Sequence, residues 1–410
     1  MSSTASAPSP PLPSTSGYIS AVRSSCLSAS THLSLTPNLP AIDAFLLSLS
    51  PLTFRRLATQ HGLTFPLRFP TPIAEINFLS ILALLNSFSG YRTAFHRATG
   101  SGAYQNVVRF MIGLYISSDA EDRVVGAASL TAKGLRGLTE AKVVELMGVS
   151  VHEEREHETL KGVTVGVRGG EMLDVVQMIL KALQGVAGKL QELGHDSLGS
   201  YVVGLLEATR KQGLDDDRAT DFLTQRLADA FVEFRDTHSI TGVGEVFLFK
   251  RIFFLLHSLR LRFGEKQDWY VPDTKRTLPM FVDNVLPTMC VWFNMFSVPE
   301  ETPKGMETLY EWVRTKHCNA DLPREKLTAG GKDAGPELSQ DETYAIRAAT
   351  LNVGRVVVER AKVLAKEEKE GREWLAELNE VDLDGYLWSV AKDDEALRSV
   401  PRLVFRSIHF

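Results

Sequence analysis

The sequence predicts a mainly α protein that folds as a single large helical domain. Apolar residues recur at helical spacing along most of the chain, and no sustained period-two alternation competes with that pattern. A chain of 410 residues with 44% hydrophobic content can bury a large core. Because no internal repeat and no clear linker divides the residues after 18, we expect 18–410 to form one domain.

Each expected helix is an apolar segment of helical period whose ends are set by Gly, Pro and capping residues, to within a few residues. Thr139 is a good N-cap for a helix that starts at Glu140, and Gly148 is placed to end that helix. In chain order, the expected helices span 41–49, 73–88, 104–116, 140–147, 171–193, 198–211, 219–234, 245–263, 278–296, 343–366 and 383–392. The segment 319–340 is rich in Gly, Lys, Asp and Pro and is typical of an exposed loop.

The first 17 residues are mostly Ser, Thr, Ala and Pro and carry no charged side chain. Such a segment is too polar and too interrupted by proline for the apolar core of a secretory signal, so we expect a disordered tail. Arg23 is the sole arginine before Arg55, whereas a mitochondrial transit peptide needs several. We therefore expect a cytoplasmic protein.

The cysteines also indicate a reducing compartment. Cys26, Cys290 and Cys318 are odd in number, widely separated and without zinc-site spacing. The longest strongly apolar runs, 76–85 and 252–256, fall short of the roughly 20 residues that span a bilayer. We expect a soluble protein with no membrane partner.

The net charge of -5 and the pI near 6.1 provide no overall basic field. Direct binding to nucleic acid is therefore not expected, since such proteins carry basic surfaces that neutralise phosphates. A small charged ligand stays compatible with this composition.

A histidine-containing charged segment, His152 to His157, resembles a zinc-binding helix at first sight. Its two histidines are five residues apart, whereas a helical metal site needs them at i and i+4. We therefore interpret the segment as a solvated charged turn and expect no metal.

The glycine-rich segment Gly162 to Glu171 precedes an expected helix, whose free amides could hold a phosphate. It lacks the Gly-Lys-Ser/Thr ending of a nucleotide P-loop and the Gly-x-Gly-x-x-Gly pattern of a dinucleotide site. A structural turn is the favoured interpretation over a phosphate cradle.

Asp283 is the first candidate for chemistry, because it lies between Pro279 and Pro287 in otherwise apolar sequence. A buried carboxylate must be hydrogen-bonded, paired or used for catalysis, since burying an unpartnered charge is costly. Lys250 and Arg347 lie in apolar helical segments. Each either extends its charge to solvent or reaches into a cleft to receive a phosphate or a buried carboxylate.

Near the C-terminus, Asp384, Tyr386 and Trp388 combine an acid, a phenol and an indole. On a helix, Asp384 and Trp388 share a face. Capping by Asp384 with core packing of the aromatics is one interpretation. Contact with a planar base, stacked on an aromatic face and hydrogen-bonded to the carboxylate, is the other.

The segment Met280 to Pro287 contains the pattern Phe-x-Asp-x-x-Leu-Pro. Further short motifs along the chain are Phe234-Arg235-Asp236, Phe249-Lys250-Arg251, Ile346-Arg347, Tyr386-Leu387-Trp388, Val400-Pro401 and Arg406-Ser407-Ile408. In their order and spacing, over about 18–410, these segments together resemble the queuosine salvage family, the queuosine 5'-phosphate N-glycosylases, whose signature is Phe-x-Asp-x-x-Leu-Pro.

The resemblance implies a helical fold similar to helix-hairpin-helix DNA glycosylases, in which Leu135 to Glu140 fits a turn before a helix. It implies hydrolysis of queuosine 5'-phosphate to ribose 5-phosphate and queuine, which is salvaged into tRNA modification, without metal or organic cofactor. Asp283 would be the catalytic carboxylate and Phe281 would wall the base pocket. Substrate contacts would come from Asp384, Tyr386, Trp388, Lys250 and Arg347.

The chain departs from the family pattern at two acidic positions. It has Ala83-Leu84-Leu85-Asn86-Ser87 where the family has Asp-Thr-x-Asn-Phe, and Ser258 where the helix after Lys250 has a further Asp. Glu75, Asp236 and Asp273 could substitute, although surface charges or helix caps are the commoner roles. These departures support an alternative function, a catalytically silent protein that binds a queuine-like base or nucleotide. A DNA or RNA glycosylase is a third reading that rests on fold analogy and is disfavoured by the acidic charge.

Overall fold

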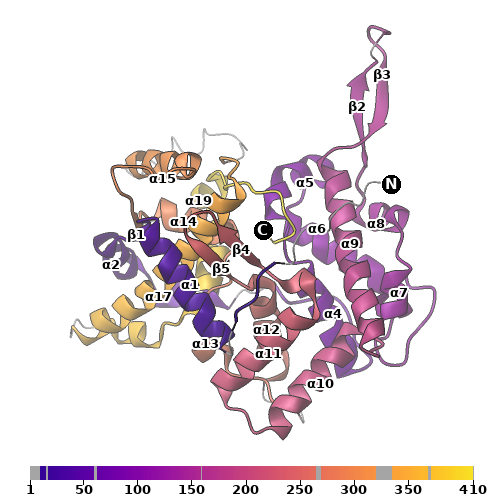
Figure 1. Cartoon of the computed structure of the whole chain (residues 1–410), viewed down its shortest axis with the longest axis horizontal. Coiled ribbons are helices and arrows are strands. Elements are labelled where there is room, and N and C mark those ends of the chain that lie inside the picture. Colours follow the sequence, from indigo (N-terminus) through magenta and orange to yellow (C-terminus); the bar gives the residue numbers. More distant parts are fainter. Residues whose placement is uncertain are drawn as a thin grey trace.

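The computed structural model describes residues 10–14, 17–59, 62–157, 159–264, 269–319, 335–367 and 371–409, without the side chains of 316–319. Helices make up most of this part of the chain, which confirms the mainly α class (Figure 1). In chain order the α-helices are α1 (Tyr18–His32), α2 (Leu39–Ser48), α3 (Pro51–Ala58), α4 (Pro72–Leu84), α5 (Arg92–Thr99), α6 (Ala103–Ile116), α7 (Ala132–Arg136), α8 (Glu140–Met147), α9 (Glu171–Glu192), α10 (Leu198–Lys211), α11 (Asp216–Ala230), α12 (Lys250–Phe263), α13 (Thr274–Thr277), α14 (Val285–Trp292), α15 (Glu307–Asn319), α17 (Gln340–Lys366), α18 (Glu380–Asp393) and α19 (Glu395–Ser399). Short 3₁₀ helices are η1 (Ser89–Tyr91), η2 (Ala128–Leu130), η3 (Val232–Phe234) and η4 (Glu373–Glu377).

The expected helices 140–147 and 198–211 match α8 and α10, and the Thr139 hydroxyl caps α8 by accepting from the Lys142 amide. The expected helix 278–296 shortens to α14, because Leu278 is extended before Pro279, as a residue before proline prefers. Pro287 is tolerated in the first turn of α14, where its missing N–H would be unpaired anyway. The helices α1, α3, α5, α7, α13, α15 and α19 were not expected from the sequence.

Short strands accompany the helices, and no individual strand is predicted from the sequence. Each of the three sheets in the described residues is an antiparallel pair: β1 (Thr36–Pro37) with β6 (Phe296–Ser297), β2 (His152–Glu156) with β3 (Thr164–Arg168), and β4 (Thr237–Ile240) with β5 (Gly244–Phe247). Strands of two to five residues are too short to give a detectable period-two pattern. The expected helix 245–263 therefore starts only at Lys250, after β5.

The β2–β3 hairpin contains the charged segment His152 to His157 and most of the glycine-rich segment Gly162 to Glu171. It projects away from the helices (Figure 1). All of β2 and most of β3 is exposed, so the charged segment is solvated as expected but is extended rather than a turn. Gly170 ends the hairpin with φ +91° before α9 begins at Glu171. A side chain there would also collide with Glu153, which explains the glycine in structural terms.

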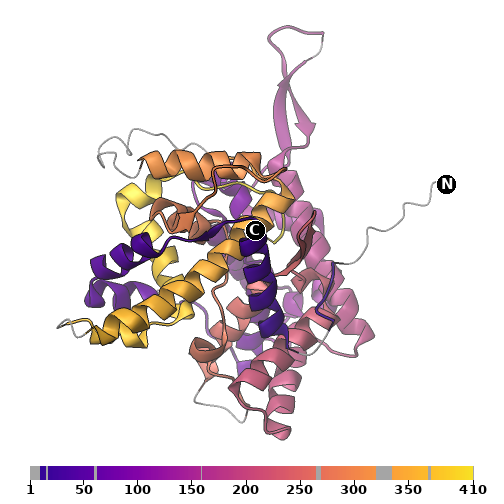
Figure 2. The ribbon, with the colours of Figure 1, turned by 60° about the vertical axis from the view of Figure 1, so that its left-hand side comes forward.

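The buried apolar residues form one contiguous core that extends along the chain from Tyr18 to Leu403. The long helix α17 lies inside it and packs against α1, α2 and α14, and Figure 2 shows α17 beside α1. The free thiols Cys26 and Cys290 are buried, whereas the side chain of Cys318 lies outside the described residues.

The expected disordered tail is partly ordered. Within residues 10–14, Leu12 packs against the core and the Pro11 carbonyl accepts a hydrogen bond from Thr237 Oγ1 at 2.8 Å. The other residues of the expected tail, apart from Gly17, lie outside the described residues, as does 320–334 of the expected loop.

Within the described ranges, no single helix is long and apolar enough to cross a membrane. The segments Pro72–Leu84 and Ser89–Thr99 reach the required length and apolarity only as a pair bent by 63°. From Ala74 on, most of α4 is buried in the protein core.

We predict that Gly90→Ala destabilises the protein by about 1–3 kcal/mol, as overpacking of a core typically does. A methyl group at Gly90 would collide with the carbonyl oxygen of Phe405 in the C-terminal segment, and backbone cannot rotate away as a side chain can. The matched control is Gly204→Ala in α10, which meets nothing within 4 Å and should stabilise the helix by about 0.5–1 kcal/mol. Urea unfolding of both variants measures the difference, and equal stabilities would contradict the close packing at Gly90.

Candidate functional site

Two neighbouring cavities have Asp283 in their walls and are called here the inner and the outer chamber. The inner chamber, of about 50 Å³, is lined mainly by aromatic and apolar side chains, and the outer chamber, of about 380 Å³, is rich in basic side chains. Residues that line both are Asn86, Tyr104, Lys250, Asp283 and Trp388. Asp283 therefore stands where the two chambers meet.

The segment that carries Asp283 lies between α13 and α14 and is held by contacts from three helices. The Asp283 carboxylate accepts from the Val285 amide at 2.8 Å, at the start of α14. The Phe281 amide donates to Asp384 of α18 at 2.7 Å, and Arg347 of α17 donates to the Val282 carbonyl at 3.0 Å. Since Asp283 retains only 8% of its surface exposed, its charge is both fixed and largely removed from bulk solvent.

Lys250 is the first residue of α12, directly after Phe249, whose φ of +50° turns the chain into the helix. Its ammonium donates to the Asn86 carbonyl at 2.8 Å and is buried at the cavity wall. Burial lowers the pKa of Lys250, and the nearby Asp283 charge opposes that shift. The two residues thus bring side chains of opposite charge type to the walls that the two chambers share.

Phe281, Asp384 and Trp388, three of the predicted substrate-binding residues, line the inner chamber. Trp388 lies one helical turn after Asp384 and meets Tyr104 edge-on, with ring centroids 6.0 Å apart. Desolvation, followed by repulsion from Asp283, raises the pKa of Asp384 well above its usual range. A raised pKa favours the protonated carboxyl group, which can donate a hydrogen bond to a ligand as well as accept one.

Arg347 does not line either chamber, which contradicts its predicted role in substrate binding. It is fully buried and makes a bidentate ion pair with Asp236, with distances of 2.9 and 2.6 Å. Tyr344 donates to the same carboxylate at 2.9 Å, and the Arg347 charge lowers the pKa of Asp236 to about 2 against the effect of burial. Of the two interpretations of Arg347 as a cleft residue, the buried carboxylate rather than a ligand phosphate is correct.

Tyr386 also lines neither chamber, so the structure gives no support to its predicted contact with a base. It is 9% exposed, with its ring 5.0 Å from that of Phe54 and 6.2 Å from that of Phe45. On α18 it points to a different face from Asp384 and Trp388, since two residues turn a helix by about 200°. Core packing explains this aromatic.

The basic wall of the outer chamber was not predicted. It comprises Arg92 of α5, Lys392 of α18, Arg398 of α19 and Arg402 of the C-terminal segment. Lys392 follows Trp388 by one turn and places its ammonium 2.7 Å from the centroid of an indole ring. The i, i+4 spacing of Lys392 and Trp388 was the one local signal in the sequence, since the other residues converge only through the fold.

The electrostatics of this wall favour an anion. Desolvation, and then the charge of Arg92, lowers the pKa of Arg402 to about 10, which leaves its guanidinium charged at neutral pH. Ser87 and Ser89 also line the outer chamber, and within the described part of the chain their buried hydroxyl oxygens have no hydrogen-bond partner. Cations together with free hydroxyl donors match the oxygens of a phosphate group.

Glu75, Asp236 and Asp273, which could substitute for the two acids of the family pattern, line neither chamber. Glu75 pairs with Arg262 at 2.6 Å, Asp273 caps α13, and Asp236 is neither a surface charge nor a cap, since it pairs with Arg347. Ala83 is buried within α4, and the Ser258 hydroxyl donates to the Phe254 carbonyl at 2.7 Å. Asp283 and Asp384 are thus the carboxyl groups among the described residues that line the two chambers.

No protein-family model matches the chain, and a search of curated proteins finds no match. Within the described ranges, no group of three or more His, Cys, Asp or Glu side chains is arranged to hold a metal ion.

Proposed function

We propose that the protein hydrolyses the N-glycosidic bond of queuosine 5'-phosphate and releases queuine. The observation that carries the proposal is the position of Asp283 between an aromatic inner chamber and a basic outer chamber. A nucleoside 5'-phosphate has the same order of parts, with a planar base, a sugar and an anion. With the base in the inner chamber and the phosphate in the outer one, the glycosidic bond lies beside Asp283.

In the reaction, the bond between the sugar C1' and the base nitrogen breaks and its electron pair leaves with the base. The sugar acquires oxocarbenium character, which a fixed carboxylate at Asp283 stabilises. A water molecule adds its oxygen to C1' and gives a proton to Asp283, while the departing base takes up a proton. The raised pKa of Asp384 allows this carboxyl group to supply that proton or to hydrogen-bond the base as it leaves.

Lys250 adds a positive charge at the junction of the two chambers, where Asp283 also lies. Trp388, Tyr104 and Phe281 offer aromatic surfaces on which a planar base packs. The substrate is a small molecule, and neither nucleic acid nor a membrane enters this proposal.

The likeness to helix-hairpin-helix DNA glycosylases belongs to the same proposal. It is supported by the pair α7 and α8, which are joined by a short turn through Gly137 and Leu138 with Thr139 as the cap of α8. A shared fold carries no activity by itself, so the functional proposal rests on the cavity.

A silent binding protein is the second candidate. It is favoured by Ala83 and Ser258, which stand at acidic positions of the family pattern and place no carboxyl group in the cavity. Such a protein would bind the nucleotide through the same chambers without breaking it.

The deciding experiment is mass-spectrometric detection of free queuine after incubation of the purified full chain with queuosine 5'-phosphate. Calorimetric binding of the same nucleotide is measured in parallel. Release of queuine supports the hydrolase, whereas binding without release supports the silent binding protein. If the protein neither binds the nucleotide nor releases queuine, both candidates are overturned.

We predict that Arg92→Gln raises KM for the 5'-phosphate by about 10–100-fold and leaves the kinetics of the unphosphorylated nucleoside unchanged. Loss of one hydrogen bond to a charged group typically costs about 1.5–3 kcal/mol. The matched control is Arg97→Gln on the same helix, whose side chain is 74% exposed and pairs with Glu171. An equal loss for nucleotide and nucleoside would show that the outer chamber does not receive the phosphate.

A further inference from the structure

The inner chamber is separated from an external groove by single side chains. Leu63 lines the inner chamber and also a groove of about 530 Å³ bordered by Thr59, Thr64, Arg262 and Lys275. His257 likewise lines the inner chamber and the neighbouring hollow that includes Arg262 and Lys275. Both residues are buried, with exposures of 8% for Leu63 and 2% for His257, so together they close this end of the chamber.

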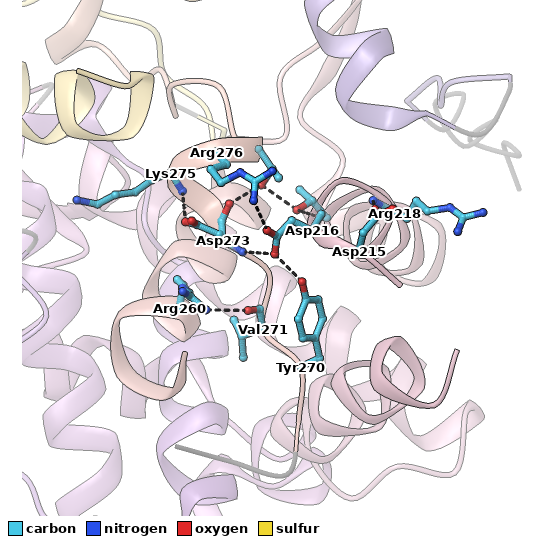
Figure 3. Close-up of polar contacts among 11 residues, drawn as sticks. Asp215, Asp216, Arg218, Arg260, Tyr270, Val271, Asp273, Lys275 and Arg276 are labelled. Atoms are coloured by element: carbon cyan, nitrogen blue, oxygen red, sulfur yellow. Dashed lines mark hydrogen bonds and ion pairs between the residues drawn. The ribbon is translucent and has the colours of Figure 1, made fainter. Parts of the chain in front are cut away.

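The His257 side of this wall is firmly held. His257 lies inside α12, its Nδ1 is 2.9 Å from the hydroxyl of Thr274, and its ring packs 5.8 Å from that of Phe281. The start of α13, where Thr274 lies, is fixed to α11 in turn. Figure 3 shows the Asp216 carboxylate accepting from Tyr270 at 2.6 Å, from the Asp273 amide at 2.8 Å and from Arg276 at 3.2 Å.

At Leu63, the wall of the inner chamber is fixed through a hydrogen bond to the neighbouring backbone. Leu63 lies outside the helices and strands, directly after Gly62, whose φ is +64°. The hydroxyl of Tyr104 donates to the Gly62 carbonyl at 3.0 Å, which ties this segment to the aromatic lining of the chamber. The Leu63 side chain is a hydrocarbon of the buried core and makes no hydrogen bond that a change of rotamer would break.

The inner chamber is small, so the rotamer of Leu63 affects how large a ligand it can hold. A volume of about 50 Å³ holds only a few water molecules, which is less than a bicyclic base with a substituent requires. Space on the far side of Leu63 is available in the groove. Its rim carries hydroxyl groups and the ion pairs Arg262–Glu75 and Lys275–Asp382, which can hydrogen-bond a polar substituent.

We propose that Leu63 is a specificity-determining residue that sets the size of the substituent that a bound 7-deazaguanine base can carry. The polar end of a large substituent passes Leu63 and lies in the groove. This inference rests on the proposed function, because it takes the inner chamber as the base site.

The test compares three nucleotides that share 7-deazaguanosine 5'-phosphate and carry hydrogen, aminomethyl or the cyclopentenediol-aminomethyl group of queuosine at position 7. We expect Leu63→Phe to lower kcat/KM for the nucleotide with the largest substituent at least about tenfold more than for the nucleotide with hydrogen at position 7. A change of about one methylene group in a hydrophobic pocket has an effect of this size. Leu63→Ala should bring kcat/KM for these three nucleotides within about threefold of one another, and it should improve kcat/KM by about tenfold for a fourth substrate with a hexose on the diol. The control is Leu193→Ala at the exposed end of α9, and thermal unfolding verifies that each variant is folded.

Calorimetric binding of the three free bases separates this inference from the proposed function. Turnover that responds equally to Leu63 variants for all substituents would overturn the role of Leu63 and leave the hydrolase intact. Base binding whose size preference shifts with Leu63, without any turnover, would support the role of Leu63 and overturn hydrolysis. Absence of both turnover and base binding would overturn the two together.

Discussion

Replacing Asp283 with Asn should lower kcat on queuosine 5'-phosphate by about 10²–10⁴-fold and change Tm by no more than a few degrees. The amide keeps the shape of the carboxylate, and its oxygen can still accept from the Val285 amide. It lacks the negative charge that stabilises an oxocarbenium-like sugar and cannot take a proton from water. Single-turnover release of queuine, followed by mass spectrometry, measures the loss in the chemical step.

Asp119→Asn, at an exposed position, is the matched control for the chemical change from carboxylate to amide. It should retain the parent rate. A second comparison is Asp384→Asn, which keeps a donor but cannot release a proton and should lower kcat less than Asp283→Asn if Asp384 acts mainly by hydrogen bonding. Full activity of the Asp283 variant would show that the central acid has been assigned wrongly.

The sequence was sufficient to locate Asp283 for a physical reason. A carboxylate in an apolar segment between two prolines must be accounted for, and the structure confirms that it is 8% exposed. The mainly α class was predictable for a similar reason, since long buried helices such as α9 carry their apolar face in the local spacing of their residues. Asp384 and Trp388 were identified as a pair because the spacing of four places them on one face.

The parts that sequence reasoning missed depend on contacts between distant segments. Arg92, Arg398 and Arg402 meet in the outer chamber from different elements, and no local pattern joins them. Arg347 was assigned to a ligand because a buried arginine and a ligand-binding arginine look alike in sequence. Only the packing of α17 against the segment after η3 brings Arg347 to Asp236.

We predict that Arg347→Met lowers the free energy of unfolding by about 3–5 kcal/mol, the usual cost of leaving one member of a buried ion pair without its partner. Asp236 would stay in a site with no solvent exposure, and the Val282 carbonyl beside Asp283 would lose its donor. Urea unfolding measures the stability. The matched control is Arg360→Met, because the partly exposed pair of Arg360 with Asp43 should be worth no more than about 1 kcal/mol.

The double variant Asp236→Leu with Arg347→Met should recover part of the lost stability, since no charge is then left buried without a partner. The parent should also show a pH dependence that this double variant lacks. The pKa of Asp236 falls from 3.8 to about 2 in the folded protein, chiefly because the Arg347 charge outweighs burial. Its contribution to stability is therefore complete above about pH 4 and is lost as pH falls toward about 2, because the unfolded chain then binds the proton more tightly. Unchanged stability of Arg347→Met together with weakened nucleotide binding would instead return Arg347 to the role of a ligand-binding residue.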